Sequence, residues 1–182
     1  MLLNFLKHEG RYIMSTFVEI KPEELTENPF KLIGSDWTLI TAEKEGKVNT
    51  MTASWGGLGI MWGKPAAYIF IRPHRYTKEF VDASDTFSLT FFDNSFKKQL
   101  GYLGSTSGRD EDKISKSNLT ITHEGSTPYF EEAKLTVICK KLYAQELSPE
   151  SFSVDGFDDK FYQDKDYHTM YIAEVQKVLI KQ

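Results

Sequence analysis

Short apolar runs and segments of alternating polarity dominate the chain, and this pattern predicts strands rather than long helices. The last of these segments keeps an apolar face with an irregularity midway, which is typical of a β-bulge. The expected strands are 37–42, 48–54, 66–71, 86–92, 119–122, 128–130, 133–147 and 169–180. A closed or partly closed antiparallel barrel would leave few strand edges exposed. We therefore expect a mainly β fold with short helices, an antiparallel Greek-key barrel.

Helical spacing occurs in two short segments between the predicted strands. The segment 76–83 has an apolar face, and Thr77 is its expected N-cap. A second helix is expected over 95–103, capped by Ser95 and closed at Gly104.

Three connecting segments carry distinct signals. A helical turn begins at Pro22, and Asn28-Pro29 is expected to stop it. The glycines of 56–59 predict a bend with close backbone approach rather than a regular strand. The acidic and aromatic stretch 148–168 is expected to be a long surface excursion, and loops of that length are usually functional or mobile.

Composition and charge narrow the functional class. The aromatic content of 14% favours a β-sheet core or a pocket for a flat ligand, and composition alone favours the core. A net charge of −4 argues against a generic nucleic-acid binder, which needs a basic face. The single cysteine, Cys139, excludes an internal disulfide and is expected to be a small buried hydrophobe. A reducing, cytoplasmic location follows as an expectation.

The length of 182 residues fits one domain. Residues 1–13 have too short an apolar run for a signal peptide, and Met14 begins a second plausible start. We expect 1–13 to be a dispensable extension or a misassigned start, and 14–182 to be a single domain. No stretch approaches the roughly 20 apolar residues of a membrane span, so no membrane association is expected.

A row of hydroxyl side chains marks the strand that ends at Trp55. On a strand, Asn49, Met51, Ala53 and Trp55 share one face, while the other carries Thr50, Thr52 and Ser54. That second row could present donors and acceptors to the polar edge of a planar ring. It could equally be an outward face whose threonines reflect β propensity.

Basic residues gather where the apolar strand 66–71 meets the predicted helix 76–83. Arg72, His74, Arg75 and Lys78 add charge, and Thr77 adds a hydroxyl. A helix N-terminus offers unpaired N–H donors to an anion, and arginine suits a terminal phosphate. A solvated basic turn is the alternative interpretation of these residues.

Several chemistries lack support in this sequence. No phosphate loop or dinucleotide fingerprint occurs, because a strand follows the glycines of 56–59 where a helix would be needed. The four histidines form none of the close pairs of a zinc site, so no metal is expected. No serine lies in a nucleophile-elbow context.

The ordered motifs nevertheless resemble a known family, the flavin reductase-like proteins with the FMN-binding split-barrel fold (the flavoredoxin-like group). The motifs that carry the resemblance are Asn49–Trp55, Pro65, Arg72–Thr77, Ser107-Gly-Arg-Asp110 with Asp112-Lys113, and Tyr167–Val175. They extend over nearly the whole chain. One departure is Ala173, where many relatives carry glycine, and it weakens the expected contact of His168.

The resemblance implies a homodimer with FMN bound non-covalently near the subunit interface. By that similarity Thr50, Thr52, Ala53, Ser54 and Trp55 border the ring and ribityl chain, with Asn49 and Met51 on the same strand. Arg75 and Thr77 hold the phosphate, with Lys78, Arg72 and Tyr76 beside them, while Ser107, Arg109 and His168 are rim positions. No catalytic residue is assigned.

Two functions fit this expectation. The first is an oxidoreductase that moves hydride or electrons between NAD(P)H and flavin or another acceptor, through a small-molecule or protein partner. The alternative is a non-catalytic electron carrier, or a binder of another flat cofactor such as haem.

Overall fold

The computed structural model describes residues 5–8, 11–14 and 17–182, and antiparallel strands dominate this part of the chain. The strands are β1 (Phe5–His8), β2 (Arg11–Met14), β3 (Phe17–Ile20), β4 (Thr38–Lys44), β5 (Lys47–Ala53), β6 (Gly56–Met61), β7 (Lys64–Ile71), β8 (Thr86–Phe91), β9 (Ile121–Glu124), β10 (Thr127–Phe130), β11 (Leu135–Glu146) and β12 (Thr169–Lys181). The α-helices are α1 (Pro29–Gly34), α2 (Tyr76–Ala83), α3 (Lys97–Ser105), α4 (Lys113–Ser117) and α5 (Phe157–Phe161). Single 3₁₀ turns occur at Pro22–Glu24, Asn94–Phe96 and Pro149–Ser151. The predicted class, mainly β with short helices, is confirmed.

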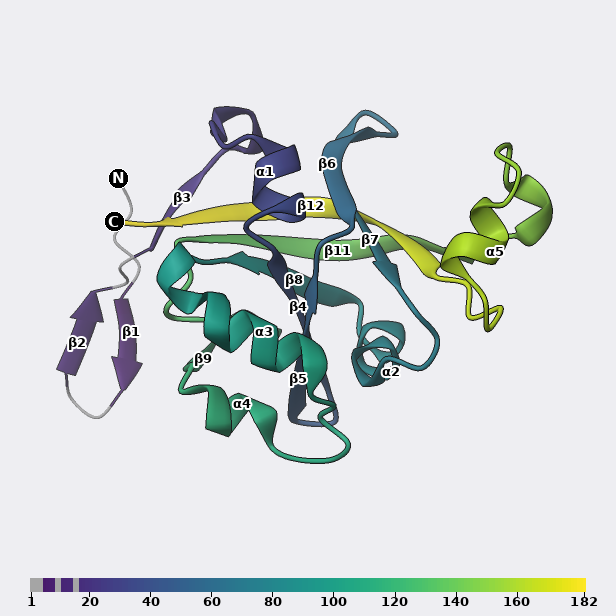
Figure 1. Ribbon diagram of the computed structural model, residues 1–182. Coiled ribbons are helices and arrows are strands. Elements are labelled where there is room, and N and C mark those ends of the chain that lie inside the picture. The colour runs from purple at the N-terminus through teal and green to yellow at the C-terminus, as the bar shows by residue number, and fades with distance from the viewer. Residues whose placement is uncertain (1–4, 9–10, 15–16) are drawn as a thin grey trace.

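One large antiparallel sheet organises the molecule, in the order β5-β4-β8-β11-β12-β7-β6. The long strands β11 and β12 cross its centre and extend together toward α5 (Figure 1). Along its other edge β12 pairs first with β7 and then, near its end, with β3. The pairing of β11 with β12 shifts register between Ile138 and Cys139, which is the irregularity that the sequence predicts.

Tight turns fix the register of the two hairpins that flank the site. Glu45 and Gly46 join β4 to β5 with φ of 51° and 75°, and Trp62 and Gly63 join β6 to β7 with φ of 52° and 71°. Two successive residues at positive φ match the right-handed twist of the strands they connect. The turn therefore sets which face of β5 and of β7 points toward the core.

The predicted bend over 56–59 is wrong, because these residues form the first part of β6 and pair with β7. The close approach is real, however. A Cβ on Gly56 would lie 2.6 Å from the backbone oxygen of Tyr68, and one on Gly57 or Gly59 would contact the Tyr68 ring. Glycine here admits the neighbouring strand and ring rather than breaking the strand.

Three helix boundaries also differ from expectation. Asn28-Pro29 begins α1 instead of ending a turn, because the Asn28 side chain accepts from the Phe30 and Lys31 amides and proline occupies the first helical position. The N-cap of α2 is Arg75, not Thr77. Ser95 lies in the 3₁₀ turn before α3 and does not cap it.

The main core lies between the curved sheet and α2, and Cys139 is fully buried within it. A second cluster packs α3 and the β10 end against the other side of β4. Burial raises the pKa of the Cys139 thiol far above its usual range, so it remains a protonated hydrophobe, as predicted. The excursion 148–168 is folded into a 3₁₀ turn and α5 and projects from one end of the sheet (Figure 1).

The expected extension 1–13 includes residues 1–4 and 9–10, which lie outside the described residues, and 15–16 do so as well. Its dispensability and the single domain 14–182 stay predictions. Among the helices of the described residues, none is long and apolar enough to cross a membrane.

Candidate functional site

The N-terminus of α2 directs two unused backbone donors toward a cavity. Arg75 occupies the N-cap position in an extended conformation, and no side chain caps the helix. Within the described part of the chain, the amides of Tyr76 and Thr77 have no hydrogen-bond acceptor. Such a helix end favours negative charge, because the free N–H groups and the helix dipole point the same way.

We call the cavity at this helix end the α2 pocket; its volume is about 110 Å³. Its wall combines the start of α2 with strand β5 and the loop that leaves α3. The lining residues are Asn49, Met51, His74, Arg75, Tyr76, Thr77, Ser105, Thr106, Ser107, Gly108 and Lys113. A space of this size accommodates one small group rather than a whole cofactor.

Two cations line the α2 pocket without a carboxylate partner in the described residues. Arg75 donates from Nη1 to the Gly104 carbonyl at 2.9 Å. Lys113 is only 4% exposed, and its Nζ donates to the carbonyls of Leu103 and Thr106, each at 2.8 Å. Burial, with a smaller effect of Arg75, lowers the pKa of Lys113 to about 8. An anion in the pocket would offset this unfavourable burial of positive charge.

Asn49 connects β5 to α2 at the back of the pocket. It is 3% exposed, and its Nδ2 donates to the Thr77 hydroxyl at 2.9 Å. The loop after α3 closes on the same amide, because Gly108 has no side chain to keep it away. Met51 faces the core from the same strand.

Arg109 covers the outer side of the α2 pocket. Its guanidinium lies 4.6 Å from the Tyr76 ring centroid, and it donates to the His74 carbonyl at 3.0 Å and to Glu79 at 2.5 Å. Ser107 turns the chain toward it, since the Ser107 hydroxyl accepts from the Arg109 amide at 3.2 Å. Of the two predicted rim positions, Ser107 lines the α2 pocket, and Arg109 contacts two residues that line it, Tyr76 and His74.

Two of the three hydroxyl groups in the predicted row, those of Thr50 and Thr52, form hydrogen bonds within the protein. Thr50 is fully buried; its hydroxyl lies 2.9 Å from that of Thr41 and donates to the Ile40 carbonyl at 3.1 Å. The hydroxyl of Thr52 donates to the Leu100 carbonyl in α3 at 2.6 Å. Ser54, exposed at the junction of β5 and β6, has no hydrogen bond to another described side chain. A ligand beside this strand would therefore meet Ser54 and the backbone, with Ala53 leaving space.

Trp55 and His168 meet beyond the end of β5. Their ring centroids are 5.0 Å apart, and Trp55 remains 46% exposed while His168 is 7% exposed. Burial, and then the nearby charge of Arg72, lowers the pKa of His168 to about 4, so the ring is neutral at physiological pH. Neither ring lines the α2 pocket, but the charge of Arg75, which does line it, also acts on His168.

The structure directs two predicted cations away from the α2 pocket. Arg72 pairs with Asp166 and donates to the Phe161 carbonyl at 2.8 Å, so it holds the excursion 148–168. Lys78 pairs with Asp82 at 2.8 Å, one helical turn along α2. Neither side chain lines the cavity.

Sequence reasoning missed Lys113 as a pocket residue. The available signal was its place in the Asp112-Lys113 motif. Asp112 caps the short helix α4 by accepting from the Ser115 amide, which fixes Lys113 as the first helical residue. A buried lysine could not be foreseen there, because lysine side chains are almost never fully buried.

We also searched the side chains for a possible metal site. No group of three or more histidine, cysteine, aspartate or glutamate side chains within the described ranges could hold a metal ion.

Comparison with solved structures identifies the fold of the chain. An FMN-binding domain of a flavin reductase-like enzyme from Shewanella baltica superposes with a TM-score of 0.67 at 16% identity, over 93% of this chain and 80% of that one. Flavoredoxin from Desulfovibrio vulgaris gives 0.64 at 18%, over 91% and 78%. An NADH:FAD oxidoreductase from Streptomyces globisporus, solved with NAD and FAD fragments, gives 0.59 at 16%, over 79% and 73%. At these identities the likeness establishes the fold, a split barrel of the flavin reductase type.

The family model described as "Flavin reductase like domain" matches residues 30–182. The chain therefore belongs to the flavin reductase-like family, which confirms the resemblance seen in its motifs. No curated protein sequence matches the chain significantly.

Proposed function

We propose that this protein binds FMN non-covalently, with the terminal phosphate in the α2 pocket and the ring beside Trp55. The observation that carries the proposal is the convergence of Arg75, Lys113 and the free amides of Tyr76 and Thr77 on one small cavity. These groups fit a phosphate, which prefers arginine and helix N-terminal amides.

The remaining predicted residues divide into two groups around such a ligand. Asn49 and Thr77 shape the back of the phosphate site, and Arg109 with Tyr76 closes its outer side. Ser54, Ala53 and the His168 ring border the space for the isoalloxazine. Lys78 and Arg72 act on neighbouring parts of the protein instead.

The activity we propose is hydride or electron transfer between NAD(P)H and flavin or another acceptor. Bound flavin itself supplies the redox chemistry. The protein's residues bind the phosphate and hold the ring against Trp55, whose side chain is 46% exposed and so offers a surface to the ring. Arg75, Arg109 and Lys113 thus act in binding and orientation.

The test compares two cations that flank the same helix end. Arg75→Ala removes a pocket guanidinium and is expected to weaken FMN binding by about 1.5–3 kcal/mol, or roughly 10- to 150-fold. Lys78→Ala is the matched control, since its ammonium pairs with Asp82 outside the pocket, and it should leave FMN affinity within about threefold of the parent. Fluorescence titration measures both, and equal affinity of parent and Arg75→Ala would remove the phosphate assignment.

A second measurement distinguishes a catalytic reductase from a non-catalytic flavin binder. Steady-state oxidation of NADH or NADPH with added FMN is expected for a reductase. Flavin binding without this oxidation would instead support an electron carrier, and a haem spectrum in place of a yellow flavin spectrum would support the other alternative.

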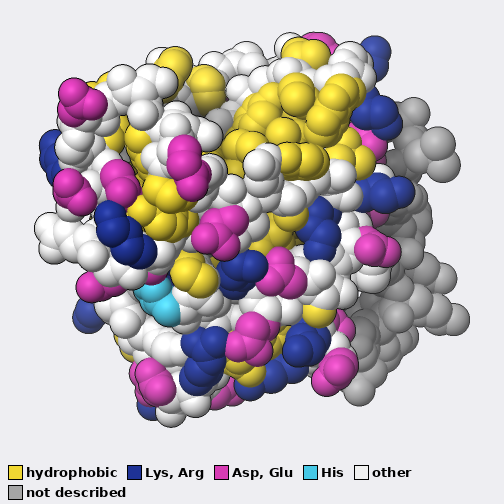
Figure 2. All heavy atoms as spheres, turned by 90° about the vertical axis from the view of Figure 1, so that its right-hand side faces the viewer, with side chains coloured by type: hydrophobic (Ala, Val, Ile, Leu, Met, Phe, Trp, Pro, Cys, Tyr) yellow, Lys and Arg dark blue, Asp and Glu magenta, His cyan; other side chains and the backbone are white. Residues whose placement is uncertain are grey.

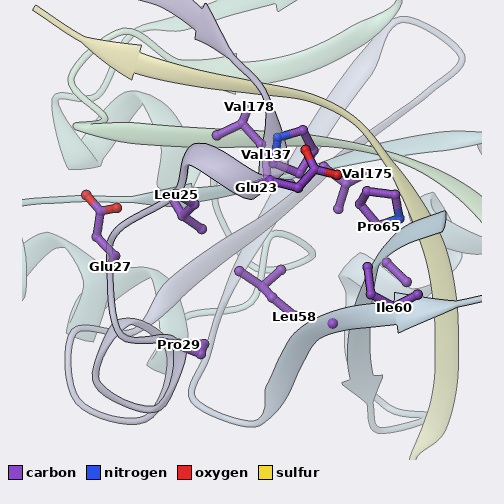
Figure 3. Close-up of a pocket in the computed structure, with 13 residues that line it drawn as sticks. Glu23, Leu25, Glu27, Pro29, Leu58, Ile60, Pro65, Val137, Val175 and Val178 are labelled. Atoms are coloured by element: carbon purple, nitrogen blue, oxygen red, sulfur yellow. The ribbon is translucent and has the colours of Figure 1, made fainter. Parts of the chain in front are cut away.

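We also propose that the protein forms a homodimer through the apolar surface around β6 and β7. A groove of about 250 Å³ opens there, and its apolar lining includes Leu58, Ile60, Val137, Val175 and Val178. Figure 3 shows Leu58 and Ile60 on β6 facing the valines of β11 and β12 across this groove.

Exposed apolar side chains continue this surface beyond the groove. Ile60 is 66% and Trp62 57% exposed, and the Trp62 ring lies 6.4 Å from that of Tyr143. Figure 2 shows hydrophobic side chains gathered in a broad patch near the top of the face that lies to the right in Figure 1. A second copy of the chain would cover such a patch.

The cytoplasmic location stays a prediction.

A further inference from the structure

Tyr162 makes a buried hydrogen bond to the histidine of the candidate site. Its hydroxyl lies 2.9 Å from Nδ1 of His168, and the two residues are 4% and 7% exposed. Burial raises the pKa of the Tyr162 hydroxyl, so this group keeps its proton and can donate it.

The protonation state of the pair follows from counting hydrogens. A neutral imidazole carries one N–H, on either Nδ1 or Nε2. If Nδ1 held it, the Tyr162 hydrogen would be buried with no acceptor, because Nδ1 is the only acceptor near the hydroxyl among the described residues and the other group that acts on it, the His168 backbone N–H, is a donor. Leaving a buried donor unsatisfied is unfavourable. The favoured state therefore has Nδ1 as acceptor and the hydrogen on Nε2.

Tyr162 is itself held on several sides. Its ring stacks on Tyr167 with centroids 4.9 Å apart, and the Arg72 guanidinium lies 5.2 Å from its centroid. Phe152 packs at 5.8 Å. Arg72 in turn binds Asp166 and the Phe161 carbonyl, which fixes the chain on either side of Tyr162. The hydroxyl thus has a defined position before any ligand binds.

The other nitrogen of His168 is free to act. Nε2 has no hydrogen-bond partner in the described part of the chain. The His168 ring lies against Trp55, and the charges that act on it are those of Arg72, Asp166, His74 and Arg75. Arg75 also lines the α2 pocket, so the charge of one pocket residue acts on the His168 ring.

We propose that Tyr162 is a positioning residue, whose hydroxyl fixes His168 as the neutral tautomer that offers Nε2–H as a hydrogen-bond donor to the ligand of the flavin site. The ligand atom it suits is a carbonyl oxygen or an unprotonated ring nitrogen. This inference rests on the proposed function, which places the flavin ring beside Trp55. It gives the excursion 148–168 a role in the site, since Tyr162 belongs to that segment.

Nitrogen-15 NMR of the full-length protein without ligand tests the tautomer directly. His168→Gln assigns the imidazole signals. In the parent we expect a protonated Nε2, an unprotonated Nδ1 and no titration of this ring near neutral pH, consistent with its pKa of about 4. In Tyr162→Phe the packing ring stays, but the two tautomers should mix. The pKa of His168 should rise, because a hydrogen bond that stabilises the neutral ring is lost, while burial continues to hold it below 6.5.

Tyr167→Phe is the matched control, because it removes a hydroxyl from the same aromatic stack that binds Asp158 instead of the histidine. It should leave the His168 tautomer unchanged. A parent protein with the proton on Nδ1, or a Tyr162→Phe variant with unchanged tautomer and pKa, would overturn the proposal.

Adding FMN then tests the donor role. Binding should shift the Nε2 signal in the parent and in Tyr167→Phe, and this shift should shrink in Tyr162→Phe. FMN binding without any change at Nε2 would overturn the ligand contact. Failure of the parent to bind FMN would overturn the proposed function and the ligand contact, and it would leave the tautomer measured in the free protein as a separate result.

Discussion

The side-chain oxygen of Asn49 occupies the space where any side chain at position 108 would begin. A Cβ on Gly108 would lie 2.3 Å from Asn49 Oδ1 and 3.3 Å from the Tyr76 ring. Because the other end of the same amide donates to Thr77, the two residues lock the loop after α3 onto the first turn of α2. The shape of the α2 pocket therefore depends on a missing side chain.

Replacement of Gly108 by alanine should loosen this contact. The Asn49 amide would have to move, its bond to Thr77 would be strained, and we expect FMN affinity to fall by about 1–2 kcal/mol. Gly101→Ala is the control, since nothing lies within 4 Å of a Cβ there. Fluorescence titration of both variants measures the effect, and a Gly108→Ala protein that binds FMN as the parent does would contradict it.

The pH dependence of flavin binding should reveal the contribution of the Lys113 ammonium to FMN affinity. Its pKa in the free protein is about 8, and a bound phosphate stabilises the charged form. FMN affinity should therefore fall as the pH rises through 8, by up to about tenfold per pH unit. Lys113→Met should bind FMN more weakly at pH 7 and lose this dependence.

The same lysine has the opposite effect on the free protein. Its pKa is lowered by folding, from 10.5 to about 8, so the unfolded chain binds more protons between these values. Its contribution to the free energy of unfolding thus increases as the pH rises through this window. Denaturation of parent and Lys113→Met without flavin, between pH 8 and 10, isolates this contribution; parallel curves would contradict it.

Gly56 is expected to be the least replaceable residue of its glycine-rich strand. It has a φ of 155°, and a Cβ there would lie 2.6 Å from the Tyr68 carbonyl oxygen, a backbone atom that cannot rotate away. Gly56→Ala should lower the free energy of unfolding by about 1–3 kcal/mol. Gly57→Ala, whose nearest contact is an ordinary 3.6 Å to the Tyr68 ring, should cost clearly less. Urea unfolding of the two variants ranks them, and a reversed order would contradict the role assigned to this contact.

Charge placed on the apolar surface should dissociate the proposed dimer. Ile60→Lys puts an ammonium into the groove beside Leu58 and Pro65, where a second copy would desolvate it at considerable cost. Sedimentation velocity should then show a monomer. Ser126→Lys adds the same charge in the exposed β9–β10 turn and should leave the dimer intact. A parent protein that sediments as a monomer at all concentrations would overturn the dimer.

The strands could be predicted well from the sequence because their signals are local. Alternation and apolar runs located β4, β5, β7, β8, β11 and β12 to within a few residues. The helix α2 was found by its spacing. The glycines of β6 led to the wrong prediction of a bend. They are needed because the Tyr68 backbone and ring on the paired strand β7 lie close to them, and this contact becomes visible only in the folded structure.

The sequence predicts where the candidate site lies better than it predicts which side chains contact one another there. Arg75 and Thr77 do line the α2 pocket, because a helix start fixes which residues face an anion. Their charge and the family resemblance place Lys78 and Arg72 beside them, but each pairs with a carboxylate elsewhere, Asp82 and Asp166. Lys113 was missed because its burial depends on carbonyls at the end of α3, which no local pattern describes.

Cys139 gives the molecule a built-in probe of its own opening. The thiol is fully buried on β11, between β8 and β12 at the centre of the sheet. A labelling reagent can reach it only when those three strands separate, and its raised pKa makes any partly sheltered thiol slow to react. The rate at which native protein consumes one equivalent of reagent should therefore measure how often the central strands part, and a ligand that tightens the barrel should slow it.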